Sequence, residues 1–339
     1  MTNTSSSAPH FPEVLSAAIE ARTSLFDFNH ESAFRLFNGF YEGFPGLTID
    51  LYGRTLVLFN YADPPEAAEA AVKFVAQFLA EQLPWLRSVV LKRRKAASIQ
   101  ERHGIILEGE LPEQVISEHG VKYAIDLLMS QDASFYLDTR SVRSWALESL
   151  KDKTVLNTFA YSGSIGVAAR AGGAKTVVHL DKQRKFLNLA KTSYTLNRLP
   201  VDKADFITGD FFSQTRRYRK SGERFDCVIV DPPFFAKTSR GTVDMLSNSH
   251  SLINKVRPLV NDGGYLLIIN NALYLNGENY YEMLASLCAD GYISIEALIP
   301  VPSDCAGYPH TIIGTPPVDP SPYNHPTKIT LMRVLRKNG

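Results

Sequence analysis

The chain has 339 residues, of which 45% are hydrophobic and 21% are charged, as is typical of a soluble globular protein large enough for two domains. Its formal net charge of +1 gives no overall signature of nucleic-acid binding, so any such contact must come from local patches. The three cysteines have no paired spacing, and we therefore expect neither a metal site nor a redox pair. The polar N-terminus and the lack of a bilayer-length apolar run exclude a membrane protein and predict a cytoplasmic one.

The first third of the chain predicts a polar tail with a short helix over residues 1–30, followed by a small α+β domain over residues 31–128. The helix is expected from the spacing of apolar residues between Phe11 and Phe28. Alternating apolar residues and turn residues predict the elements of the domain, which are hairpins over 47–61 and 115–126, a helix over 66–83 and a strand over 88–92.

The stretch from Val155 to Ala169 predicts a buried strand, a tight glycine turn and a helix. Residues 154–159 are mostly β-branched and apolar, whereas Ser162 and Gly163 break the pattern. A glycine at position 163 lets the backbone approach a ligand closely, and the N-terminus of the next helix offers free N–H groups. The first glycine of the dinucleotide-binding fingerprint is missing, so this pattern alone fits any strand–helix turn equally well.

Three further strands are each followed by an acidic residue. The strands are predicted over 176–180, 204–208 and 225–230, and the acids are Asp181, Asp210 and Asp231; a helix is predicted over 184–197. An acid after the second strand is placed to accept both ribose hydroxyls of a nucleoside cofactor. Any one of these aspartates fits a helix cap or a turn as well, but their alignment at successive strand ends favours a binding site.

The rest of the chain predicts further helices and strands of the same domain, which begins near residue 129. We expect helices over 140–150 (capped by Asp138 or Thr139), 243–260 and 280–290, a strand over 265–269, and closing antiparallel strands over 293–301 and 327–335. The segment 302–326 is too long for a simple connection, which fits either substrate contacts or an ordered surface loop.

The order of these motifs resembles that of S-adenosylmethionine-dependent methyltransferases with a Rossmann-like fold. The resemblance rests on Asn157 to Gly166, Asp181, Gly209-Asp210 and the tetrapeptide Asp231-Pro232-Pro233-Phe234. Residues 34–39, 43–53 and 131–140 also resemble segments of a bacterial subgroup that modifies large-subunit ribosomal RNA. The resemblance implies an α/β fold with a seven-stranded, mostly parallel sheet over residues 129–339, S-adenosyl-L-methionine as the cofactor and ribosomal RNA as the partner.

The same resemblance implies which residues hold the cofactor. The turn from Tyr161 to Gly166 would pack against its methionine part, and Asp181 would hold the ribose. Asp210 would accept a hydrogen bond from the adenine amino group, beside Phe211. Many relatives have an acid at the position of Asn157, whose amide can still accept. The expected cofactor contacts are Phe135, Asp138, Arg140, Asn157, Phe159, Tyr161, Ser162, Gly163, Asp181, Lys182, Asp210, Phe211 and Asp231.

The tetrapeptide from Asp231 to Phe234 resembles the substrate motif of enzymes that methylate planar nitrogens or bases. Two prolines stiffen the loop, so that Asp231 and the Pro232 carbonyl can accept hydrogen bonds from the target base. The ring of Phe234 either stacks on a flipped-out base or packs in the core. We therefore expect Asp231, Pro232, Pro233 and Phe234 to be the catalytic residues.

The residue after the fifth parallel strand bears on the target atom. Methylation at carbon-5 of a pyrimidine needs a thiolate that adds to the ring, and in the carbon-5 members this cysteine follows the fifth strand. The present chain has Asn271 there, while Cys227 and Cys288 fall within a predicted strand and a predicted helix. A base nitrogen is therefore favoured as the target, and guanine is suggested by analogy alone.

Two basic clusters, over residues 92–95 and 216–220, fit either phosphate contacts or solvated faces. The subgroup often carries an RNA-binding barrel before the segment that begins at Phe34, where this chain has too few residues to form one. Several alternatives therefore stay open. They are a protein or small-molecule acceptor, a cytosine carbon-5 target, a cofactor-binding ribosome-assembly module without catalysis, and a homodimer.

Overall fold

A sheet of seven strands organises most of the structure, a computed structural model that describes residues 11–238 and 240–336. The strand order is β10-β9-β8-β11-β14-β16-β15. The first five of these strands are parallel, whereas β16 runs antiparallel to both of its neighbours. The strands are β8 (Thr154–Thr158), β9 (Thr176–Asp181), β10 (Phe206–Thr208), β11 (Phe225–Val230), β14 (Val260–Asn270), β15 (Ile293–Leu298) and β16 (Lys328–Val334). The expected α/β fold with a mostly parallel seven-stranded sheet is confirmed.

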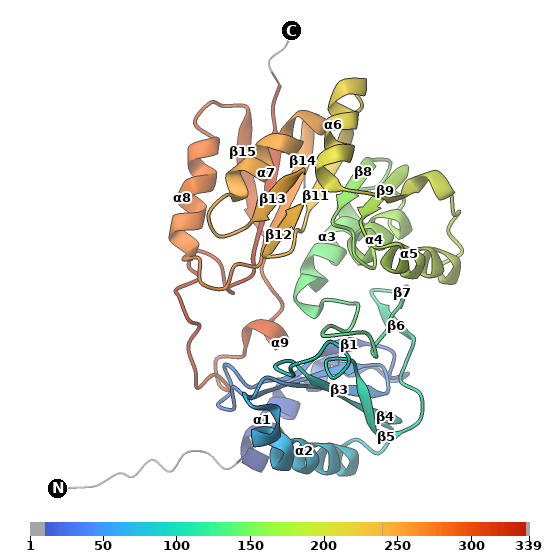
Figure 1. The fold of residues 1–339 in the computed structure, drawn as a ribbon, viewed down its shortest axis with the longest axis vertical. Coiled ribbons are helices and arrows are strands. Elements are labelled where there is room, and N and C mark those ends of the chain that lie inside the picture. The colour runs from blue at the N-terminus through green and yellow to red at the C-terminus, as the bar shows by residue number, and fades with distance from the viewer. Residues whose placement is uncertain (1–10, 239, 337–339) are drawn as a thin grey trace, which may run out of the picture. The chain divides into compact units, whose positions relative to one another are not determined.

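Helices cover both faces of this sheet, because successive residues of a strand point to opposite sides (Figure 1). They are α3 (Arg140–Ser149), α4 (Ser164–Ala171), α5 (Arg184–Leu196), α6 (Phe211–Ser221), α7 (Ser249–Val256) and α8 (Gly277–Leu287). Leu156 and Val228 face a core that also contains side chains of α6, α7 and α8. On the other face, α4 packs on Asn157, Val177 and His179, and contacts α3 and α5. Within the described residues, no helix is long and apolar enough to cross a membrane.

A second sheet has five strands in the order β1-β2-β3-β4-β5. All neighbours are antiparallel except β3 and β4, which are connected through α2. The elements are α1 (Phe11–Ala21), β1 (Ala33–Asn38), β2 (Leu47–Tyr52), β3 (Thr55–Asn60), α2 (Glu69–Gln82), β4 (Ser88–Arg93) and β5 (Ile105–Gly109). Leu15 of α1 and Val75 and Leu79 of α2 pack on the strands in one apolar core. A separate hairpin of β6 (Val115–Glu118) and β7 (Val121–Ala124) turns at His119-Gly120, as predicted.

The chain forms two compact units that alternate along the sequence. The first comprises the chain up to Ser117, Asp126–Ala133 and Ser303–Thr315, and the second comprises Glu118–Ile125, Ser134–Pro302 and the chain from Pro316. In the first unit, the buried Arg22 forms an ion pair with Glu42 at 3.0 Å and donates to the Asp304 carbonyl at 3.1 Å. Part of the long segment 302–326, including α9 (Ser303–Ala306), thus packs in the first unit. The domain limits given in the sequence analysis stay a prediction.

The predicted helix over 243–260 is too long, because residues 243–248 and Val260 are not helical. Instead, β12 (Phe235–Thr238) and β13 (Gly241–Asp244) form a hairpin, α7 begins only at Ser249, and β14 already starts at Val260. Asp244 explains the break, because its carboxylate accepts hydrogen bonds from the N–H groups of Leu246 and Ser247 at 3.1 and 3.0 Å. Most apolar residues of this range are buried, but they belong to β13, α7, β14 and the turns between them.

Candidate active site

The five parallel strands end at one edge of the sheet, as the pairing of Thr158 with Leu180 and Val230 and of Asp181 with Thr208 shows. The strand ends at this edge and the loops that follow them carry Tyr161 to Gly163, Asp181, Asp210, Asp231 and Asn271. The structure thus brings the residues predicted from four separate motifs to the same edge. Ligands of open α/β sheets bind at this edge.

The turn after β8 has an unusual backbone. Phe159, Tyr161 and Gly163 have φ angles of 54°, 52° and 76°, which lie in the left-handed region. Two of these residues are not glycine, and such conformations persist only where the surroundings hold them in place. Here the hydroxyl of Ser162 donates a hydrogen bond to the Ser134 carbonyl, which ties the turn to the segment before α3. The surroundings therefore hold the turn at the point where α4 begins, and the first N–H groups of a helix are donors that can bind a ligand.

Packing also requires the glycines of this turn. A Cβ at position 163 would lie 2.7 Å from the Ala190 Cβ, and one at position 166 would lie 2.5 Å from Cε1 of His179. His179 is fully buried, and burial lowers its pKa to about 3, so that its ring is neutral. The ring stacks on Phe206 with centroids 5.1 Å apart. The glycines thus let α4 lie directly on this ring, and their part in ligand approach stays a prediction.

Asp181, at the end of β9, is hydrogen-bonded to the turn after β8. Its carboxylate accepts from the N–H of Tyr161 at 2.9 Å and from the N–H of Gln183 at 2.8 Å. A carboxylate has about four lone-pair positions, and backbone N–H groups, including that of Lys182, do not use all of them, so acceptor capacity remains for a ribose hydroxyl. Burial raises the pKa of Asp181 above its usual value. The residue is therefore held in place by the glycine turn, and it keeps the capacity that a nucleoside cofactor needs.

Asp210 and Phe211 follow the end of β10. The Asp210 carboxylate caps α6 by accepting from the Ser213 N–H at 3.0 Å, and it lies 3.8 Å from the Lys182 ammonium. Phe211 is buried and stacks on Phe159, with ring centroids 4.6 Å apart. Asp210 is only partly buried and retains acceptor positions for an amino group, whereas Phe211 acts mainly through this stack.

The segment before α3 is organised by a buried arginine that the sequence reasoning missed. Arg143 donates to both oxygens of Glu118, at 2.6 and 2.8 Å, and lies over the ring of Phe135, 4.0 Å from its centroid. Arg140 also pairs with Glu118, at 3.4 Å. Phe135 and Arg140 are thus part of a structural network; their predicted contacts with the cofactor remain untested. The spacing of Arg140 and Arg143 on one helix was the only sign of this network in the sequence.

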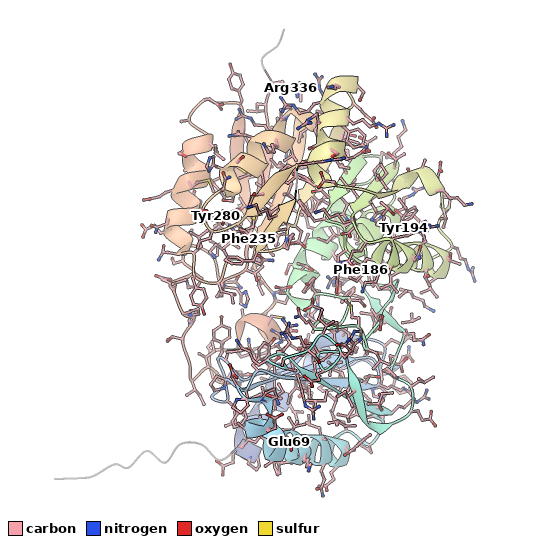
Figure 2. All side chains as sticks on the ribbon, in the orientation of Figure 1. Glu69, Phe186, Tyr194, Phe235, Tyr280 and Arg336 are labelled. Atoms are coloured by element: carbon pink, nitrogen blue, oxygen red, sulfur yellow. The ribbon has the colours of Figure 1, made fainter. Side chains whose placement is uncertain are left out.

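The loop after β11 carries the predicted substrate motif. Burial, together with the neighbouring Asp138 carboxylate, raises the pKa of Asp231 to about 7. Phe234 is 45% exposed and therefore does not pack in the core; the adjacent Phe235, labelled in Figure 2, is 56% exposed. The Asn271 amide donates to the Pro232 carbonyl at 3.4 Å, which brings the ends of β11 and β14 together. A titratable carboxyl thus lies beside exposed aromatic rings.

The raised pKa predicts that Asp231→Asn stabilises the cofactor-free protein as the pH rises. An unfolded aspartate ionises at about pH 4, whereas folded Asp231 ionises only near pH 7, so its ionisation opposes folding throughout this interval. Asparagine carries no charge that must be buried. The melting temperature of the variant should therefore exceed that of the wild type by an amount that widens between about pH 5 and pH 8. Thermal melts at both pH values check this, and a constant or shrinking difference would refute the raised pKa.

Comparison with known proteins identifies the class. The sequence pattern that defines S-adenosylmethionine-dependent methyltransferases matches residues 35–289, and the chain belongs to this family. Its cofactor is S-adenosylmethionine, and the turn after β8, the N-terminus of α4 and the acceptors on Asp181 fit such a molecule. Residues of the candidate site were predicted from the sequence, but each individual contact with the cofactor stays a prediction.

Particular relatives narrow the class. Proteins named "Ribosomal RNA large subunit methyltransferase I" from Aliivibrio fischeri and Photobacterium profundum are 31% and 32% identical to the chain over 291 and 288 residues. Each alignment covers 84% of this chain and 72% of the relative. The fold is similar to that of a methyltransferase from Streptococcus mutans, with a TM-score of 0.81 at 22% identity, covering 98% of this chain and 83% of the other. A further solved methyltransferase, in complex with SAH, gives a TM-score of 0.82 at 22% identity over the same shares of the chains.

Proposed function

We propose that the protein methylates a base nitrogen of RNA, with large-subunit ribosomal RNA as the substrate and guanine as the base. The RNA substrate is supported by the names of the relatives that are 31–32% identical. One observation supports a base nitrogen as the target: the loop after β11 combines Asp231, Pro232 and the exposed ring of Phe234. Guanine rests on analogy with enzymes of similar motif.

The loop after β11 has the groups that bind a base outside a helix. An exposed aromatic ring contributes about 1–3 kcal/mol when a base stacks on it, and Phe234 and Phe235 are both exposed. The Pro232 carbonyl receives one long hydrogen bond from Asn271, so its second lone pair can accept from an amino group of the base. Stacking and hydrogen bonding together would hold the target nitrogen in a fixed position.

Asp231 suits the proton transfer that this reaction needs. The cofactor supplies an electrophilic methyl group on a sulfonium. When the base nitrogen bonds to that methyl group, the methyl–sulfur bond would break and the sulfur would leave as a neutral thioether. The nitrogen would lose a proton, and the ionised Asp231 carboxylate would accept it. A general base works best when its pKa lies near the working pH, and that of Asp231 is about 7. No covalent bond between protein and base is required.

The cysteines of the second unit offer no thiolate for the alternative reaction at carbon-5. Cys227 is fully buried within β11, and burial raises its pKa far above the usual range. Burial also raises the pKa of Cys288, at the end of α8. A nucleophile must be ionised to attack, so both thiols are unsuited to it.

A variant without these thiols tests the nitrogen target. We expect Cys227→Ala/Cys288→Ser to retain wild-type methyl transfer to RNA, because neither thiol takes part in the reaction. Digestion of the labelled RNA and mass spectrometry of the nucleosides should give a nitrogen-methylated base, with methylguanosine expected. A carbon-5 methylpyrimidine, or loss of transfer in a variant that still melts cooperatively and binds the cofactor, would contradict this assignment.

A further inference from the structure

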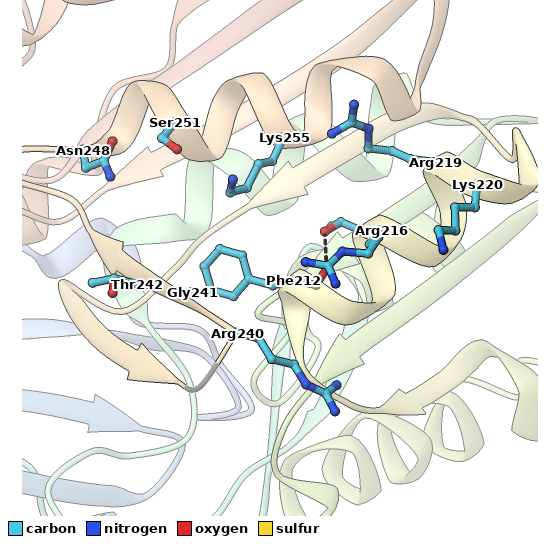
Figure 3. A pocket seen from close by; sticks show the side chains of 11 residues that line it. Phe212, Arg216, Arg219, Lys220, Arg240, Gly241, Thr242, Asn248, Ser251 and Lys255 are labelled. Carbon is cyan, nitrogen blue, oxygen red and sulfur yellow. Dashed lines mark hydrogen bonds between the residues drawn. The ribbon is translucent and has the colours of Figure 1, made fainter.

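The larger unit carries a pocket of about 670 Å³ with a strongly cationic wall (Figure 3). Arg216, Arg219 and Lys220 come from α6, Lys255 from α7, and Arg240 from the turn between β12 and β13. Among the described residues that line the pocket, none is acidic. Five cationic residues from three separate segments therefore line one hollow of the surface.

Helical spacing explains why the three cations of α6 point the same way. Arg216 and Lys220 are four residues apart and Arg219 is three residues after Arg216, so these side chains share one face of the helix. Arg217 is also exposed, but it points in a different direction around the helix and does not line the pocket. The basic cluster seen in the sequence is thus divided into a part that forms the pocket and a part that does not.

The hairpin of β12 and β13 is packed firmly against α6. A Cβ at Gly241 would lie 2.7 Å from ring atoms of Phe212, so only glycine lets the backbone rest on this ring. The Arg240 guanidinium donates to the Ser213 hydroxyl, and the Lys255 ammonium lies 5.9 Å from the Phe212 ring centroid. The cations are therefore brought together by packing between elements.

The cationic side chains of the pocket favour the binding of an anion. Over the part of the chain that the structure describes, Arg216, Arg219, Lys220 and Lys255 form no ion pair with an acidic residue. Like charges gathered in one place repel each other unless a bound anion neutralises them. Threonine and serine hydroxyls on the same wall add neutral donors. Guanidinium groups, ammonium groups and hydroxyls are the donors with which proteins bind phosphates.

The hairpin connects this pocket to the loop proposed to hold the base. β12 starts at Phe235, directly after Phe234, and the turn with Arg240 follows the four residues of the strand. At about 3.3 Å per residue, the strand spans roughly 13 Å. Nucleotides that flank a base stacked on Phe234 can therefore reach the pocket with their phosphates.

We propose that this pocket binds backbone phosphates of the RNA beside the target nucleotide. The inference rests on the proposed function and assigns the RNA backbone to a definite place on the methyltransferase unit. Such contacts carry no base specificity; they set the register of the RNA, and they make binding dependent on salt.

Neighbouring arginines of α6 provide a matched test. RNA binding to the full-length protein is measured at several salt concentrations for Arg216→Ala, for Arg219→Ala and for the control Arg217→Ala. Each pocket variant should bind RNA several-fold more weakly than the wild type, and the slope of log affinity against log salt should shrink by about 0.7 for each lost contact. The control should leave affinity and slope unchanged. Cofactor affinity and melting temperature should be the same in all four proteins, and the KM for RNA should rise without a fall in kcat.

Four results would overturn the inference. Wild-type RNA affinity in the pocket variants, in a protein that binds and methylates RNA, would refute the pocket while leaving the proposed function intact. Equal losses in the pocket variants and in Arg217→Ala would show a diffuse charge effect instead of a site. If the wild type neither binds nor methylates RNA, both the pocket assignment and the proposed function are refuted. A melting temperature that inorganic phosphate raises in the wild type but not in Arg216→Ala, with equal RNA affinity, would assign the pocket to a free anion.

Discussion

An Asp231→Asn variant is expected to transfer methyl groups at least about 100-fold more slowly than the wild type at saturating substrates. The amide has nearly the same shape, but it cannot take the proton that the base nitrogen releases. The expected loss is that of a positioned general base, about 10²–10⁴-fold. The rate of transfer under single-turnover conditions measures it, because product release does not then limit the rate.

A residue at the opposite end of the same strand supplies the control. Asp226 accepts from the N–H and hydroxyl of Thr154 and from Asn261, so that Asp226→Asn removes a structural carboxylate of β11. This control should lower the melting temperature but leave the rate of transfer close to that of the wild type. Asp231→Asn should also bind SAH as tightly as the wild type, within about threefold. Wild-type transfer by Asp231→Asn would remove Asp231 from the proposed mechanism.

An Asp181→Ala variant is expected to bind S-adenosylmethionine about 10- to 100-fold more weakly. Hydrogen bonds to a charged acceptor contribute about 1.5–3 kcal/mol, and the ribose would lose its partners on this carboxylate. The N–H groups of Tyr161 and Gln183 would lose their acceptor at the same time, which loosens the turn. Calorimetric titration with S-adenosylmethionine and with SAH measures the affinity of each.

The Asp181→Asn variant separates the two contributions. Its side-chain oxygen can still accept one hydrogen bond, so its loss of affinity should be smaller than that of the alanine variant. Both variants should lose affinity for SAH as well, because the ribose is common to the two molecules. Affinity within about twofold of the wild type in Asp181→Ala would exclude the ribose contact.

The sequence predicted the edge of the larger sheet well. Buried parallel strands appear as short apolar runs, and the acids that follow them mark where each strand ends. Asp181, Asp210 and Asp231 therefore came to the same edge as expected. The sequence could not decide whether Phe234 is buried or exposed, because an aromatic residue after a strand fits the core as well as the surface. In the structure Phe234 is exposed.

Features that depend on tertiary packing were not predictable. The ion pair of Arg143 with Glu118 joins residues 25 positions apart, and the spacing of Arg140 and Arg143 on one helix does not identify Glu118 as their partner. β5 is exposed along its whole length and therefore lacks the alternation that identifies a strand. The end of β13 falls in the predicted helix over 243–260 because Val243 lies at a helical spacing from later apolar residues, and the rest of the hairpin was not predicted. The cationic pocket likewise needs three segments that only the fold brings together.

The most direct test of RNA methylation uses total RNA from a strain that lacks the protein. The purified protein is incubated with this RNA and labelled S-adenosylmethionine, and the label in large-subunit ribosomal RNA is measured beside that in protein and small-molecule fractions. The control is RNA from the parent strain, which contains the protein and in which the target nucleotide is therefore already methylated. We predict label in the large-subunit RNA of the deficient strain and little in the control. Label confined to protein or small molecules, or no transfer by a protein that binds the cofactor tightly, would contradict the proposed function.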